Sequence, residues 1–90
     1  MNELEQARNV INDIDKEMAS LFERRMEAVI SVANYKKANS MPILDSSRES
    51  LVIERNLAYI ENDDMKQYYE EFIKSVMNIS KEYQKKLLDI

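Results

Sequence analysis

The stretch LEQARNVINDIDKEMASLFERRMEAVISVANYK, residues 4–36, decides the fold of this chain. Side chains recur in it at heptad spacing in two series, which are Leu4, Ile11, Met18, Arg25, Val32 and Ala7, Ile14, Leu21, Ala28, Tyr35. Every position in the two series is apolar or aromatic except Arg25. Because no Gly or Pro occurs before Pro42, the pattern predicts one uninterrupted helix over residues 4–36.

The predicted helix is too long for a compact domain of this size. About 33 residues form a helix roughly 50 Å long, whereas a compact chain of 90 residues has a radius of gyration of about 12 Å. The apolar seam therefore needs a cover that the chain cannot supply alone. A second copy of the same chain is the simplest cover, so we expect a homodimer.

The composition favours a single all-α domain over residues 1–90. The chain has no Gly and one Pro, and its many Glu, Lys, Met, Leu and Ile residues favour helices. A net charge of -4 argues against nucleic-acid binding, and no apolar run is long enough to span a membrane. The segment Met1–Arg8 has no basic n-region and the chain has no cysteine, so we expect a cytoplasmic protein.

The residue types that are missing narrow the possible chemistry. Without Cys or His there is no thiol nucleophile, no Ser-His triad and no imidazole base. A zinc site would need carboxylates alone, and no Gly-rich loop is present to hold phosphate. We expect no metal and no cofactor, so that any catalysis would depend on binding and electrostatics.

Two further helices are expected after the first. The segment Lys37–Pro42, KANSMP, has the composition of a connecting loop. A second helix begins near Asp45, either with Asp45 as N-cap or with a capping box of Ser46 and Glu49, and ends at Tyr59 or Ile60. The turn Glu61–Asp64 leads to the third helix.

The third helix carries two candidate core stripes. One contains Met65, Tyr69, Phe72, Val76, Ile79 and Tyr83, and the other contains Ile73, Met77, Ser80, Gln84 and Leu87. Ser80 and Gln84 share a face at i and i+4. They are either a tolerated polar pair at the edge of the core or part of a binding site.

Arg25 is the main irregularity of the first helix. A cation at a core position needs a partner, which is a Glu across the bundle, the solvent, or a ligand. Lys36 lies eleven residues further on and returns to nearly the same face, so both can point at one ligand. Arg8 precedes Arg25 by seventeen residues, or about 25 Å, and reaches such a ligand only from an antiparallel partner chain.

Each polar residue also has an ordinary structural explanation. Lys36 is then a solvated lysine at a helix end, and Asp45, Arg48 and Glu49 form a cap with a local ion pair. Taken together, the three arginines, the lysine, the amide, the hydroxyl and the carboxylate indicate a site for a small polyanion. Two carboxylates on the ligand would each suit one arginine fork.

The order of these residues resembles the all-helical class of chorismate mutases. The resemblance rests on Arg8, Asp15, Arg25-Met26-Glu27, Tyr35-Lys36, Pro42-Ile43, Asp45-x-x-Arg48-Glu49 and Ser80-x-x-x-Gln84. It implies an intertwined homodimer of three-helix chains, without cofactor or metal, that converts chorismate to prephenate on the route to phenylalanine and tyrosine. This Claisen rearrangement is unimolecular, so the absence of His and Cys agrees with it.

The resemblance also implies roles for individual residues. Arg25 and Arg48, with Arg8 from the partner chain, are similar to the groups that hold the two substrate carboxylates, and Ser80 to the hydroxyl that assists them. Lys36 and Gln84 resemble the pair that hydrogen-bonds the ether oxygen. Glu49, with the backbone around Asp45, resembles the acceptor of the ring hydroxyl.

Two alternatives remain open from the sequence. An isochorismate-pyruvate lyase shares this scaffold and much of the site, and only the product distinguishes it. A non-catalytic helical dimerisation module is the other alternative, although it gives no reason for Arg25 in the seam or for the polar pair Ser80 and Gln84.

Overall fold

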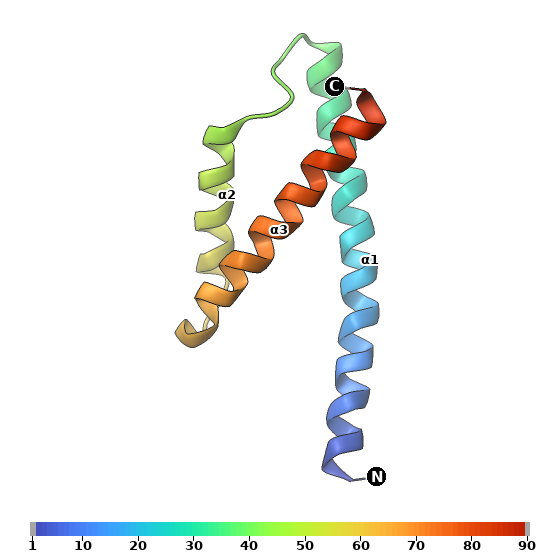
Figure 1. Cartoon of the computed structure of the whole chain (residues 1–90), viewed down its shortest axis with the longest axis vertical. Helices are drawn as coiled ribbons and strands as arrows, with labels where there is room; N and C mark the ends of the chain where they lie inside the picture. The colour runs from blue at the N-terminus through green and yellow to red at the C-terminus, as the bar shows by residue number, and fades with distance from the viewer. Residues whose placement is uncertain (1, 90) are drawn as a thin grey trace.

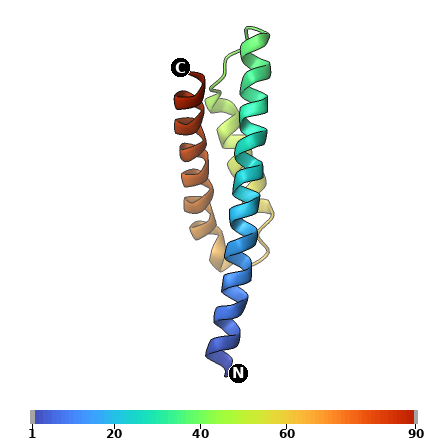
Figure 2. The ribbon, with the colours of Figure 1, turned by 90° about the vertical axis from the view of Figure 1, so that its right-hand side faces the viewer.

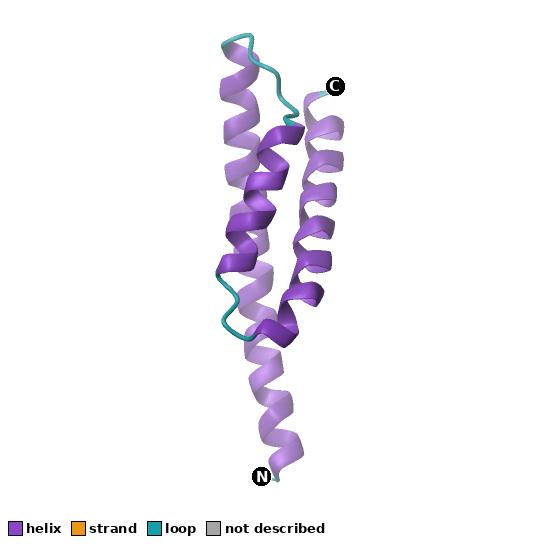
Figure 3. Cartoon of the chain, turned by 90° about the vertical axis from the view of Figure 1, so that its left-hand side faces the viewer, coloured by secondary structure: helices purple, strands orange, loops and turns teal. Residues whose placement is uncertain are grey.

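A computed structural model describes residues 2–89 and contains three α-helices with no strand among those residues. They are α1 (Glu3–Ala38), α2 (Ser46–Ala58) and α3 (Asp63–Leu88). Figure 1 shows α2 and α3 side by side, and Figure 3 shows the two loops that connect the three helices. The all-α prediction with a long first helix, a short second helix and a long third helix is confirmed.

Helix α1 begins and ends with polar caps. The Asn2 side chain accepts a hydrogen bond from the Glu5 backbone N–H at 2.8 Å, which satisfies one of the free donors of the first turn. The loop that the sequence predicted from Lys37 begins only after Ala38, so that prediction was wrong by two residues. The Met41 N–H donates to the Lys36 carbonyl at 2.8 Å and Ser40 has a positive φ of 55°, so the chain turns sharply away from the helix end.

Helix α2 is capped by Asp45. Its carboxylate accepts from the backbone N–H groups of Ser47 at 3.1 Å and Arg48 at 3.4 Å, so the first of the two N-terminal alternatives is correct. Glu49 does not complete a capping box with Ser46, because its carboxylate pairs with Lys81 of α3. The helix ends at Ala58 with Tyr59 as its C-cap, one residue before the earlier of the two predicted ends.

Helix α3 lies between the other two helices. It packs against both α1 and α2, whereas the backbones of α1 and α2 do not contact each other. The buried apolar residues among those described are Met26, Ala33 and Ile73. This core lies beside the C-terminal half of α1, and the N-terminal half projects beyond the other helices (Figure 2).

The sequence left open which stripe of α3 faces the core, and the structure answers this. Ile73, Ser80 and Gln84 are buried, whereas Met65, Phe72, Ile79 and Tyr83 are exposed. The stripe that contains the two polar residues is therefore the inner one. Tyr69 of the outer stripe is half-buried, and its hydroxyl donates to the Asn56 side-chain oxygen at 3.3 Å.

Every residue from Asn2 to Arg24 is exposed in the single chain. Seven large apolar side chains lie in this stretch with exposed fractions of 40–57%, namely Leu4, Val10, Ile11, Ile14, Met18, Leu21 and Phe22. The chain measures 56 × 26 × 15 Å, and its radius of gyration of 16.4 Å exceeds the value of about 12 Å for a compact domain of this length. No described helix is long and apolar enough to span a membrane.

Candidate active site

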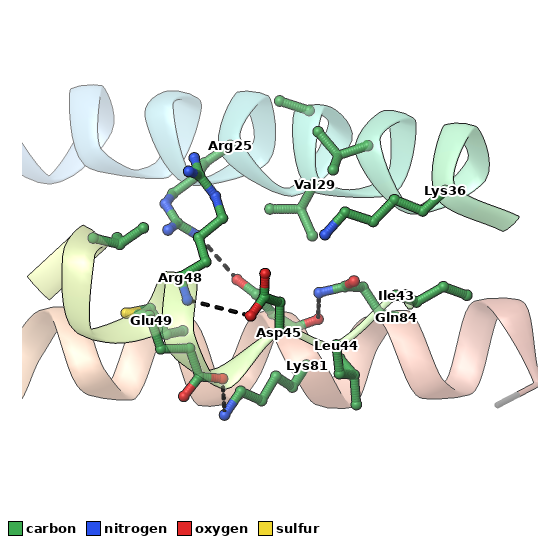
Figure 4. A pocket seen from close by; sticks show the side chains of 15 residues that line it. Arg25, Val29, Lys36, Ile43, Leu44, Asp45, Arg48, Glu49, Lys81 and Gln84 are labelled. Carbon is green, nitrogen blue, oxygen red and sulfur yellow. Dashed lines mark hydrogen bonds and ion pairs between the residues drawn. The ribbon is translucent and has the colours of Figure 1, made fainter. Parts of the chain in front are cut away.

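A cavity of about 300 Å³ lies among the three helices. Seven of the eight predicted site residues line it, and these are Arg25, Lys36, Asp45, Arg48, Glu49, Ser80 and Gln84. Figure 4 shows how α1 lies on one side of this cavity while α2 and α3 form the other. Arg8 is exposed on the N-terminal half of α1 and does not line the cavity.

Arg25 has a hydrogen-bond partner on α3. Its Nη1 donates to the Ser80 Oγ at 3.1 Å, and the Ser80 hydroxyl in turn donates to the Val76 carbonyl at 2.8 Å. Ser80 is only 3% exposed, so a buried hydroxyl fixes the guanidinium at the cavity wall. The partners predicted for Arg25 from the sequence were a Glu, the solvent or a ligand, and this serine was not among them.

Gln84 is the second buried polar residue of α3, with an exposed fraction of 9%. Its Nε2 donates to the Ser80 carbonyl one turn earlier, at 3.2 Å. An amide nitrogen carries two hydrogens, so one bond to the helix backbone anchors the side chain and leaves a second donor for a ligand.

Asp45 is an exposed cap whose carboxylate is occupied by its own helix. The Ser47 hydroxyl donates to Asp45 Oδ1 at 2.6 Å. That bond, followed by the backbone bond from Arg48, holds the pKa of Asp45 below its usual value. The same bonds fix the first turn of α2, which carries Arg48 and Glu49 to the cavity (Figure 4).

Glu49 forms an ion pair with Lys81 across the gap between α2 and α3. Lys81 also lines the cavity, although it was not among the site residues predicted from the sequence. The two residues are 32 positions apart on different helices, so no local pattern could reveal the pair. In the sequence, only the charge of Lys81 and its place directly after Ser80 could have indicated that it lines the site.

The lining combines charge with apolar walls. Four cations and two carboxylates line the cavity, and the cations are Arg25, Lys36, Arg48 and Lys81. The apolar side chains are Ala28, Val29, Val32, Ile43, Leu44, Val52 and Met77. No cluster of described residues is suited to hold a metal ion. Such a cavity can bind a small dianion and surround its apolar part, because apolar walls strengthen the charge interactions.

The cap at Asp45 predicts a specific pH dependence of stability. Because the folded-state pKa is lowered, the contribution of the ionised cap is present above the usual Asp pKa of about 4 and is lost as the pH falls through the folded-state pKa. We expect acid to lower the melting temperature of the wild type more than that of Asp45→Asn, since Asn caps a helix without titrating. Thermal melts followed by circular dichroism from neutral pH into acid measure the difference, and two parallel curves would contradict it.

Comparisons with known proteins point to one family. Residues 7–85 match the sequence model of a family described as chorismate mutase type II. A bifunctional chorismate mutase/prephenate dehydratase of Buchnera aphidicola subsp. Schizaphis graminum (strain Sg) is 37% identical over 54 residues, which are 60% of this chain and 14% of that protein. The match thus spans a small part of that relative's length. No solved structure matches the chain.

Proposed function

Because this chain belongs to the chorismate mutase type II family, we propose that it catalyses the rearrangement of chorismate to prephenate in phenylalanine and tyrosine biosynthesis. The observation that carries the proposal is the cavity, where residues far apart in the sequence present four cations, a buried amide and a buried hydroxyl to one small volume. We also propose that the protein acts in the cytoplasm, a location that suits a chain without cysteine.

The proposed reaction breaks one C–O bond and forms one C–C bond within a single molecule. Arg25 and Arg48 hold the two substrate carboxylates, and the apolar walls favour a compact diaxial conformer in which the two reacting carbons meet. No proton is transferred and no covalent intermediate forms. The site therefore needs no general base, in agreement with a chain that has neither His nor Cys.

Negative charge grows on the ether oxygen as the C–O bond breaks. The Lys36 ammonium and the free N–H of Gln84 stabilise that charge, and the stabilisation is large because the donors are already in place. A millionfold acceleration requires about 8 kcal/mol. Because both reacting carbons already belong to one molecule, conformer selection supplies only part of this energy, and the two preorganised donors at the ether oxygen supply the rest.

We further propose that the active form is an intertwined homodimer in which Arg8 of each chain completes the other chain's site. The exposed apolar residues of α1 from Leu4 to Leu21 support a helix–helix interface. Arg8 lies on the same α1 helix, about 25 Å from Arg25. An antiparallel partner helix brings the two arginines to one end of the same cavity.

The test of the proposed function is the ultraviolet absorbance of chorismate with time on purified protein, with chromatography of the products. Conversion to prephenate alone supports the mutase. Release of pyruvate from isochorismate, with chorismate unchanged, would assign the protein as a lyase on the same scaffold. Turnover of neither substrate by a folded protein would leave a helical interaction module.

Replacing Gln84 by Glu is expected to make activity depend on acid. The buried side chain must donate a hydrogen bond, and a carboxyl group donates only while it is protonated. We expect kcat/KM of Gln84→Glu to fall as the pH rises, whereas that of the wild type changes little over the same range. Initial rates across the pH range measure this. Gln84→Met, which has no donor at any pH, is the control and should be weak throughout.

A further inference from the structure

Lys81 is a fourth cation of the cavity wall, and its role is not explained by the contacts proposed above. It comes from α3, and its Nζ forms an ion pair with Glu49 Oε1 on α2. Both side chains are 30% exposed, so the pair is partly shielded from solvent. Figure 4 shows the two side chains meeting where the two helices face each other.

The pair determines which cations remain available to a ligand. Arg48 precedes Glu49 in α2, and Arg25 and Lys36 line the same cavity. A carboxylate near these groups would pair with one of them and compete with the carboxylates of an incoming ligand. Among the described residues, Glu49 forms its ion pair with Lys81 and with no other cation. In this structure the Glu49 carboxylate is therefore paired with Lys81 and with neither Arg25 nor Arg48.

The pair also fixes one oxygen of Glu49 and leaves the other free. The ammonium contacts Oε1, and no second ion pair of Glu49 occurs among residues 2–89. An ionised carboxylate only accepts hydrogen bonds, so a group held by one oxygen presents the other as an oriented acceptor. Under the proposed function, the ligand group that meets this acceptor is the ring hydroxyl of chorismate.

The charge of the lining agrees with such a ligand. With Lys81 included, four cations and two carboxylates give the cavity a net charge of +2, equal and opposite to that of a dicarboxylate. Without Lys81 the same cavity would carry +1, and Glu49 would be left to pair with a cation that the ligand needs.

We propose that Lys81 is a positioning residue that holds the Glu49 carboxylate as an acceptor for a hydroxyl of the ligand and prevents it from pairing with the substrate-binding arginines. The proposal rests on the proposed function, because it assumes a dicarboxylate ligand in this cavity. Its consequence is selectivity: the site discriminates between dicarboxylates that carry the hydroxyl and those that lack it.

The test compares two oxabicyclic dicarboxylates, one with the ring hydroxyl and one without it, by isothermal titration calorimetry. The wild type should bind the hydroxylated compound about tenfold more tightly, as expected for a hydrogen bond to a charged acceptor. In Lys81→Met, the ratio of the two dissociation constants should fall to near one. Lys81→Arg keeps a cation at this position and should retain most of the preference.

Two further variants make the comparison sharper. Lys85→Met removes a lysine one turn later on α3 that pairs with Glu82 at 3.6 Å and does not line the cavity, so its ratio should equal that of the wild type. Lys81→Gln repeats the loss of charge with a side chain that also favours helices. It replaces Lys81→Met if circular dichroism shows that the methionine variant is not folded.

The outcomes separate this proposal from the one on which it depends. If the wild type binds the hydroxylated compound and both charge-removing variants keep its preference, the proposal for Lys81 is overturned while the proposed function stands. The proposal for Lys81 is also overturned if these variants have a lower melting temperature and bind both compounds more weakly by the same factor. The ion pair of Lys81 and Glu49 would then only hold two helices together. If the wild type binds neither compound, the proposed function itself fails and this proposal with it.

Discussion

Replacing Lys36 by Ala is expected to lower kcat/KM for chorismate about a thousandfold while the helices remain folded, since removal of one preorganised donor at a developing oxyanion costs up to about that factor. Lys36 is half-buried near the end of α1 and lines the cavity. Its ammonium is the charged member of the proposed pair at the ether oxygen. The loss should appear mainly in kcat, because the charge develops only in the transition state.

The structure gives a reason for the fold to survive this change. The contacts of Lys36 with the following loop use its main-chain carbonyl, which accepts from the N–H groups of Asn39 and Met41. Alanine keeps that carbonyl and has the highest helix propensity. Lys37→Ala is the matched control, because Lys37 is exposed and does not line the cavity. Equal kcat/KM for Lys36→Ala and the wild type would contradict the proposed role.

Mixing two inactive variants is expected to restore activity. Arg8→Ala and Arg25→Ala should each lower kcat/KM at least about a hundredfold, as loss of one partner of a buried charge pair does. If Arg8 acts across the interface, a mixed dimer has one site with both arginines and one site with neither. Random exchange of chains gives mixed dimers as half of the population, so about a quarter of the wild-type activity should return.

The control for this experiment combines Arg25→Ala with Arg48→Ala. Both residues belong to the same chain's cavity, so every site in a mixed dimer lacks one of them and no activity should return. Native mass spectrometry of differently tagged chains establishes that mixed dimers form. Mixed dimers without recovered activity in the Arg8 and Arg25 experiment would show that Arg8 does not complete the partner's site.

The helices could be predicted because their signals are local. The absence of Gly and Pro before Pro42 and the cap at Asp45 placed the boundaries of α1 and α2 within one or two residues. The capping box of Ser46 and Glu49 was not distinguishable from the Asp45 cap by pattern. It is absent because Glu49 has a better partner in Lys81, on a helix that comes later in the chain.

The site could be predicted only in part, because it is assembled by contacts between helices that are far apart in the sequence. A separation of eleven residues, about three turns, puts Arg25 and Lys36 on nearly the same face of α1. The i,i+4 spacing of Ser80 and Gln84 puts them on one face of α3. How these faces meet depends on how the helices dock, so the bond from Arg25 to Ser80 was not accessible from sequence. The choice of the inner stripe of α3 was undetermined because both stripes are largely apolar.

If the proposed dimer covers the exposed N-terminal half of α1, the stability of this segment depends on the protein concentration. Residues 3–24 form a helix whose side chains are all exposed in the single chain, and most of the stability of a protein helix comes from packing of its apolar face. If the proposed dimer forms, dilution below its dissociation constant should fray this segment first, before the part around Met26 and Ile73. Amide hydrogen exchange in residues 3–24 should slow as the protein concentration rises, because association with a second chain stabilises this part of the helix by mass action.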